Sequence, residues 1–191
     1  MRNAIAIALL LLTACATVPR EMTPPADAAL AADLRAMAQE DVEAQKRWAA
    51  DRQNPAMREE MRQLFAKHVA RLEEIIAAHG WPGITLVGFN GMNDAWLLAQ
   101  HGGRDFLPKV LPLMYEAVLK HELDENLYAT SLDRVLVQQG KKQMYGTQFA
   151  PDLCAPLPIE DPEHVDERRK RAGMVPLAEY AQEVCGATPQ R

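Results

Sequence analysis

Apolar residues recur along most of the chain at spacings of three, four and seven, which is the pattern of amphipathic helices. The first long helix is predicted over about residues 27–51. Its apolar face carries the row Leu30, Leu34, Met37, Asp41 and Trp48. Asp41 is the anomaly, because a carboxylate on a core-facing line is either paired inside the protein or turned into a cavity. A position at the edge of the stripe, beside a basic neighbour, is the alternative.

A second long helix is predicted from Asn54-Pro55 to His79, with Gly80 as its end. Asn54 is a suitable cap, and Pro55 occupies the first helical position, where its missing N–H does no harm. His68 lies in the middle of the apolar face of this helix. A histidine there is either a core residue with a satisfied hydrogen bond or a functional base.

The stretch 93–102 predicts a short helix that is apolar on most sides. Asn93 is its expected cap, and Gly102 is expected to close it in a left-handed conformation. Since such a helix is mostly buried, Gln100 and His101 at its end are carried toward the interior and need partners there. Residues 84–87, before this helix, are predicted to be a short extended piece.

Four further helices complete the pattern. They are predicted over residues 105–121, with Asp105 as cap and a kink or a split at Pro112, over 125–139, over 162–171 with Asp161 as cap, and from Pro176 onward. Residues 141–160 show no periodicity. The fold class is therefore all-α: a single-domain irregular bundle of about six to seven helices, with a long polar loop before the penultimate helix.

The N-terminal residues have the character of a targeting segment. Residues 4–12 form an apolar run of the length of a signal-peptide core, too short to span a bilayer. The run ends in Leu12-Thr13-Ala14-Cys15, which resembles the bacterial lipobox, in which the cysteine is acylated. An ordinary signal peptide with a chance cysteine is the alternative. The resemblance implies a signal peptide over 1–14, a lipidated Cys15 with a tether over 15–26, and a helical domain over 27–191.

Three further features of the sequence bear on the location and the binding partners of the protein. The residue at position 16 is Ala rather than Asp, which by resemblance to the lipoprotein sorting rule favours the outer membrane, with the domain facing the periplasm. A net charge of -5 gives no reason to expect nucleic acid as a partner. Cys154 and Cys185 remain in the mature body. They form either a disulfide, which an oxidising compartment permits, or two independent buried thiols.

Six short motifs occur in a fixed order along the folded part. They are Gly80-Trp81-Pro82, Ala95-Trp96-Leu97 with Gln100-His101, Leu111-Pro112-Leu113, Asp133-Arg134-Val135, Tyr145-Gly146-Thr147-Gln148 and Val165-Asp166-Glu167-Arg168-Arg169. Together they resemble a bacterial family catalogued only as a domain of unknown function, over roughly residues 34–180. The resemblance implies one complete domain and carries no reaction. This chain has Gly102 where that family usually has Ala, which shortens the expected helix.

The polar residues on apolar faces are the candidates for chemistry. The proposed acid–base group is His101, His68 and Asp41. The proposed ligand contacts are Trp96, Gln100, Gln143, Tyr145, Thr147, Gln148, Asp166, Arg168 and Arg169. If all of these converge, they form a pocket with a histidine base, an orienting carboxylate, amide donors and an arginine clamp for an anionic group. The alternative is a buried hydrogen-bond network that only fixes helix packing.

Three functions remain open on these residues. The first is a domain that binds a small anionic or amide-bearing ligand. The second is a metal-independent hydrolase or lyase with His101 or His68 as base, and the third is a structural envelope lipoprotein. The sequence contains no Gly-x-Ser-x-Gly, His-Glu-x-x-His, P-loop or dinucleotide motif, and we expect neither a cofactor nor a metal. The lipid bilayer, reached through Cys15, is the expected partner, and the oligomeric state is left open.

Overall fold

The computed structural model describes residues 24–150 and 154–186. The predicted signal peptide and Cys15 lie outside these residues. Within them, seven α-helices confirm the all-α class. The helices are α1 (Ala28–Ala50), α2 (Pro55–His79), α3 (Ile84–His101), α4 (Gly103–Leu119), α5 (Glu125–Gln138), α6 (Val165–Arg171) and α7 (Leu177–Gly186), with a 3-10 turn over Pro162–His164. Two short antiparallel strands, β1 (Phe149–Ala150) and β2 (Ala155–Pro156), lie in the polar loop.

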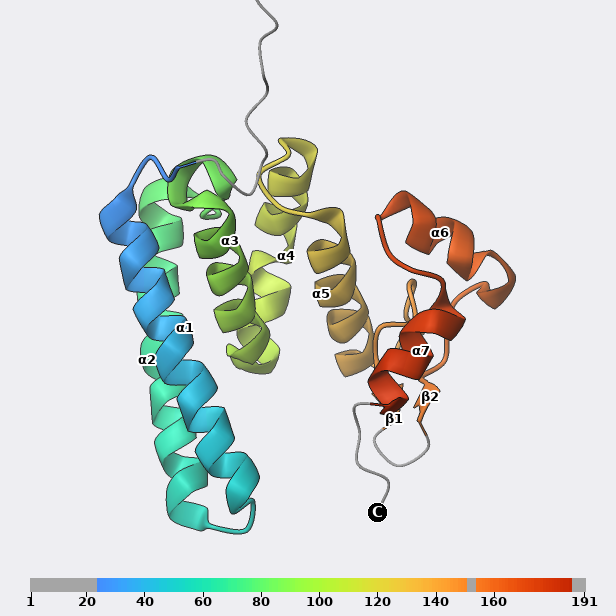
Figure 1. Ribbon diagram of the computed structural model, residues 1–191, viewed down its shortest axis with the longest axis horizontal. Coiled ribbons are helices and arrows are strands. Elements are labelled where there is room, and N and C mark those ends of the chain that lie inside the picture. The colour runs from blue at the N-terminus through green and yellow to red at the C-terminus, as the bar shows by residue number, and fades with distance from the viewer. Residues whose placement is uncertain (1–23, 151–153, 187–191) are drawn as a thin grey trace, which may run out of the picture.

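The helices are arranged in successive layers (Figure 1). Helices α1 and α2 form a long antiparallel hairpin, and α1 packs against α3, which adjoins α4. Helix α5 packs on α4, and the unit of β1, β2, α6 and α7 lies beyond α5, on the side away from α1 and α2. The apolar core is built mainly from α1 to α4. Its most deeply buried members include Leu34, Leu72, Met92, Leu98, Leu107 and Met114.

The first two helices begin and end where their caps predict. The side chain of Asp27 accepts a hydrogen bond from the Leu30 N–H, and the side chain of Asn54 accepts from Ala56 and Met57. Gly80 ends α2 with a φ of 74°. These boundaries depend on contacts within four residues, which is why the sequence alone predicts them.

The region around α3 differs from the sequence-based prediction. Residues 84–87 are the first turn of α3 rather than an extended piece, and Asn93 lies inside the helix instead of capping it. Gly88 interrupts the helix with a φ of 71° and a ψ of 170°. The helix ends at His101, but Gly102 has a φ of -67°, and the left-handed residue is Gly103. The proline-rich α4 then begins at Gly103 rather than at Asp105 and runs through Pro112 without being split.

The C-terminal part is more ordered than the sequence predicts. Residues 141–160 contain the β1–β2 pair and a bridge between Gln143 and Ile159, so the segment is not a structureless loop. The helix predicted over 162–171 divides into the 3-10 turn and α6. Asp161, its expected cap, has a φ of 45° and makes no side-chain cap hydrogen bond. Cys154 and Cys185 form a disulfide with 5.7 Å between their Cα atoms, which joins the loop to α7.

No helix among the described residues is both long enough and apolar enough to cross a membrane.

Candidate functional site

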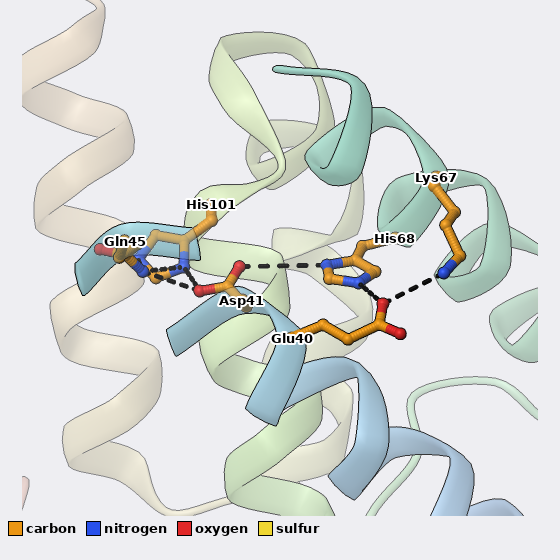
Figure 2. Close-up of polar contacts among 6 residues, drawn as sticks. All are labelled: Glu40, Asp41, Gln45, Lys67, His68 and His101. Atoms are coloured by element: carbon orange, nitrogen blue, oxygen red, sulfur yellow. Dashed lines mark hydrogen bonds and ion pairs between the residues drawn. The ribbon is translucent and has the colours of Figure 1, made fainter. Parts of the chain in front are cut away.

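A polar cluster lies where the apolar core ends. Helices α1 and α2 continue past the end of α3, and His101 is the last residue of α3 (Figure 1). Asp41 from α1 and His68 from α2 are buried, with 0% and 2% of their surface exposed, whereas the His101 side chain is 22% exposed. Figure 2 shows the Asp41 carboxylate between the two imidazole rings. The structure therefore brings together the three residues that the sequence suggested for acid–base chemistry.

Asp41 and His101 form a hydrogen-bonded dyad. His101 Nδ1 lies 2.9 Å from Asp41 Oδ1. An ionised carboxylate only accepts hydrogen bonds, so Nδ1 carries the proton and Nε2 is the basic nitrogen of the ring. The Phe65 ring stacks on the imidazole at a centroid distance of 5.5 Å. Asp41 and Phe65 thus set both the tautomer and the plane of the His101 ring.

Gln45 lies against the same histidine, one turn after Asp41 on α1. Its amide nitrogen donates to Asp41 Oδ1 over 2.7 Å and lies 3.0 Å from Nδ1 and 3.2 Å from Nε2 of His101. With Nδ1 protonated, Nε2 is the ring atom able to accept from this amide. Gln45 therefore occupies the position where a donor group of a ligand would meet the basic nitrogen.

His68 lies between two carboxylates on the other side of Asp41. Its Nε2 is 3.3 Å from Glu40 Oε2, and its Nδ1 is 4.0 Å from Asp41 Oδ2 (Figure 2). A hydrogen bond from Lys67, followed by the contact with His68, lowers the pKa of Glu40. Both His68 Nδ1 and Asp41 Oδ2 are buried without a hydrogen-bond partner. Such unpaired buried atoms are costly, so this part of the cluster is not optimised for stability alone.

Asp133 on α5 organises a second polar network, which the sequence reading missed. Asp133 is identified from the sequence only as part of the Asp133-Arg134-Val135 motif. In the structure it is 0% exposed and accepts hydrogen bonds from the N–H groups of Met144, Tyr145 and Thr147 and from the Thr147 hydroxyl. In the sequence, the one indication that Asp133 has a structural role is its place in the Asp133-Arg134-Val135 motif. Tyr145 and Thr147 are thus parts of a turn wrapped around a carboxylate.

The two arginines expected to clamp an anion bind backbone carbonyls. Arg168 donates to the carbonyls of Met144, Glu160 and Asp161, and the buried Arg169 donates to those of Tyr145 and Val175. These bonds hold the loop against α6. An anionic ligand at either guanidinium would have to displace them.

The remaining loop residues serve the same network. Gln143 donates to the carbonyls of Gln148 and Leu157, and its side-chain oxygen accepts from the Gln148 N–H. Asp166 accepts from the backbone N–H of Leu177 at the start of α7. Within residues 24–150 and 154–186, no hydrogen bond or ion pair joins this network to Asp41, His68 or His101, so the expected single pocket divides into two parts.

Trp96 and Gln100 face α5 rather than the histidines. Trp96 Nε1 donates to the Leu127 carbonyl and to Ser131 Oγ, and Gln100 Nε2 donates to the same hydroxyl over 2.7 Å. These bonds fasten α3 to α5.

Along the described chain there is no group of three or more His, Cys, Asp or Glu side chains arranged to hold a metal ion.

The protein is an all-α domain in which the buried Asp41 carboxylate lies between the imidazole rings of His68 and His101 (Figure 2). The chain belongs to DUF6624, a family of unknown function whose sequence profile matches residues 28–188. This agrees with the resemblance to an uncharacterised domain family noted from the motifs. No curated protein and no solved structure matches the chain.

Proposed function

We propose that the protein is a lipid-anchored acid–base enzyme in which His101 is the general base and Asp41 its positioning residue. The observation that carries the proposal is the 2.9 Å contact between His101 Nδ1 and Asp41 Oδ1, in a ring that keeps 22% of its side chain exposed. A buried carboxylate that holds one ring nitrogen makes the other the basic nitrogen, which takes a proton from a bound molecule once that molecule replaces the Gln45 amide.

The proton transfer follows from the tautomer. His101 Nε2 takes a proton from an O–H or N–H group of the bound molecule, after that group has replaced the Gln45 amide at the ring. The imidazolium that forms is stabilised by Asp41, whose Oδ1 already accepts the Nδ1 proton. The reaction class is therefore hydrolysis. His101 takes the proton of a water molecule whose oxygen attacks the carbonyl carbon of an ester or amide, and the imidazolium returns the proton to the leaving alkoxide or amine as its bond to that carbon breaks. Since Arg168 and Arg169 are bonded to carbonyls, an anionic substrate is not favoured over a neutral one.

His101→Gln tests this proposal. Purified protein is screened against chromogenic esters and amides and against cell-wall peptides, and any turnover is compared with that of His101→Gln. We expect the rate to fall by about 100-fold or more, because general-base catalysis contributes 10²–10⁴-fold. His79→Gln is the matched control, since His79 is an exposed histidine at the end of α2. Turnover that survives in His101→Gln would refute the assignment.

Binding without turnover is a second candidate, favoured by the unpaired Asp41 Oδ2 and His68 Nδ1. With His68 Nε2 donating to Glu40, His68 Nδ1 accepts as Asp41 Oδ2 does, so a ligand group that donates to both would satisfy both atoms. Calorimetry separates the two candidates. A molecule that binds wild type, is recovered unchanged and loses affinity in a His68→Ala variant supports this second function.

The anchoring part of the proposal concerns Cys15 and the outer membrane, with the domain facing the periplasm. Its support is the Leu12-Thr13-Ala14-Cys15 sequence, together with the Cys154–Cys185 disulfide, which suits an oxidising compartment. We expect labelled palmitate to be incorporated into the wild-type chain and the protein to sediment with outer membranes. Cys15→Ser should lose both properties, and a soluble wild-type protein without label would contradict the anchor.

A further inference from the structure

A second polar cavity lies at the break in α3. It has a volume of about 300 Å³ and is bounded by Pro25, by α1 at Ala31, Ala32 and Arg35, and by α3 from Val87 to Gly91 and at Asp94. Small residues on both helices leave this space open. A Cβ on Gly91 would lie 2.8 Å from Val87 Cβ of the same helix and 3.7 Å from Ala31 Cα of α1, so the absence of a side chain at Gly91 keeps this part of α3 close to α1. The volume suits a small molecule.

Asp94 is the charged group at the base of this cavity. It is 6% exposed, and burial raises the pKa of its carboxyl, with Arg35 acting in the opposite direction. Arg35 Nε lies 3.1 Å from Asp94 Oδ2, but this oxygen is buried and receives no hydrogen bond. A buried carboxylate oxygen without a donor is unfavourable, and an ammonium group in the cavity would supply the missing donor.

Positive charge borders the same cavity and suits an anionic group. Gly88 breaks α3, and the helix starts again at Phe89 and Asn90, which border the cavity. The carbonyls of Thr85 and Leu86 in the turn before the break accept from the N–H groups of Ala26 and Asp27. The N-terminal end of the restarted segment, which carries the positive end of its helix dipole, thus borders the cavity, and the half-exposed Arg35 guanidinium beside Asp94 adds a full positive charge.

We propose that this cavity binds a zwitterionic α-amino acid, with its ammonium group at Asp94 and its carboxylate at Arg35 and the start of the second segment of α3. The two opposite charges border one small cavity, which matches a ligand that carries an ammonium and a carboxylate group on the same carbon atom. The site is separate from the proposed base. Asp94 precedes His101 by seven residues on α3, which is about 10 Å along the helix.

The experiment measures binding of L-alanine and L-leucine to the full-length protein by calorimetry and by the shift in melting temperature. N-acetyl-L-alanine and L-alaninamide, which each lack one of the charges, are the matched probes. We expect both analogues to bind at least about tenfold more weakly than the amino acids, because each leaves a charged group of the site unpaired. Equal affinity for the analogues, or no binding of amino acids at millimolar concentration, would overturn the proposal.

Two variants tie the binding to the cavity. Asp94→Asn should weaken L-alanine binding at least about tenfold, since the charge facing the ammonium group is lost. Ala32→Leu should do the same by filling the cavity from an exposed position of α1 that takes part in no core packing. Asp33→Asn is the control, because Asp33 pairs with Arg71 on the neighbouring helix. Unchanged binding in Ala32→Leu and Asp94→Asn would overturn the assignment.

Stability measurements show whether Asp94→Asn still folds. An acid whose pKa is raised on folding contributes stability that is fully present below its unfolded pKa and is lost as the pH rises. Wild type should therefore lose stability relative to Asp94→Asn as the pH rises above the pKa of an unfolded aspartate, about 3.9. A variant that is stabilised at neutral pH and still fails to bind L-alanine has lost a ligand contact rather than its fold.

Discussion

Asp133→Asn is expected to lower the free energy of unfolding by about 3 kcal/mol. The Asp133 carboxylate is fully buried and accepts from three backbone N–H groups and one hydroxyl. An asparagine keeps one acceptor oxygen but turns an NH₂ group toward N–H donors that then have no partner. Because Thr147 is buried, with 6% of its surface exposed, its N–H and hydroxyl do not regain a partner from bulk water and the desolvation penalty is not recovered.

Chemical denaturation measures the loss, and amide hydrogen exchange locates it. Protection should fall first at the Met144, Tyr145 and Thr147 amides, since the turn they form depends on Asp133. Thr147→Val is the graded comparison, because it removes one hydroxyl bond and should lower stability by about 1 kcal/mol. An Asp133→Asn protein within about 1 kcal/mol of wild type would show that the turn holds without the carboxylate.

Asp41→Asn is expected to reduce the proposed turnover by 100-fold to about 10⁴-fold. The amide of asparagine no longer requires a proton on His101 Nδ1, so the ring loses the tautomer in which Nε2 is basic. The imidazolium formed during proton transfer also loses the negative charge 2.9 Å from its Nδ1. The effect should lie in kcat rather than in KM, because Asp41 is buried and does not touch the bound molecule.

The nitrogen-15 chemical shifts of the His101 ring provide a readout that a purely structural role would not change. In wild type they should report a proton on Nδ1, and in Asp41→Asn a mixture of tautomers. Glu40→Gln is the matched control, because Glu40 contacts His68 and Lys67 and makes no contact with His101 (Figure 2). Equal loss of rate in both variants, with the His101 tautomer unchanged, would contradict a positioning role for Asp41.

The sequence predicts those residues of the candidate site that interrupt the apolar face of a helix. Asp41 falls on the line through Leu34 and Trp48, and His68 falls within the apolar face of α2, so periodicity marks both as buried polar groups. The pairing of Asp41 with His101 spans 60 residues. Helical spacing contains no information on which distant faces meet, so convergence was a hypothesis until the packing of α1 on α3 was known.

The errors around α3 and in the loop have a common physical origin. Gly88 was not recognised as an interruption within one helix, because the carbonyls it frees are satisfied by Ala26 and Asp27, about 60 residues earlier. In the same way, the turn over residues 143–148 depends on Asp133 and Arg168 from two other elements. Local propensity is a weak guide wherever a distant group provides the hydrogen bond.

The sequence by itself determined the all-α class, the ends of α1 and α2, the cysteines available for pairing and the anomaly of Asp41. These features rest on caps, proline and glycine positions and apolar spacing, all of which act within about one or two turns. Only the tertiary structure decided that Asp41 lies between His68 and His101 (Figure 2), that Arg168 and Arg169 donate to backbone carbonyls, and that Asp94 borders a cavity. A buried charge takes its partner from whichever element packs against it, and that choice belongs to the packing of the whole chain.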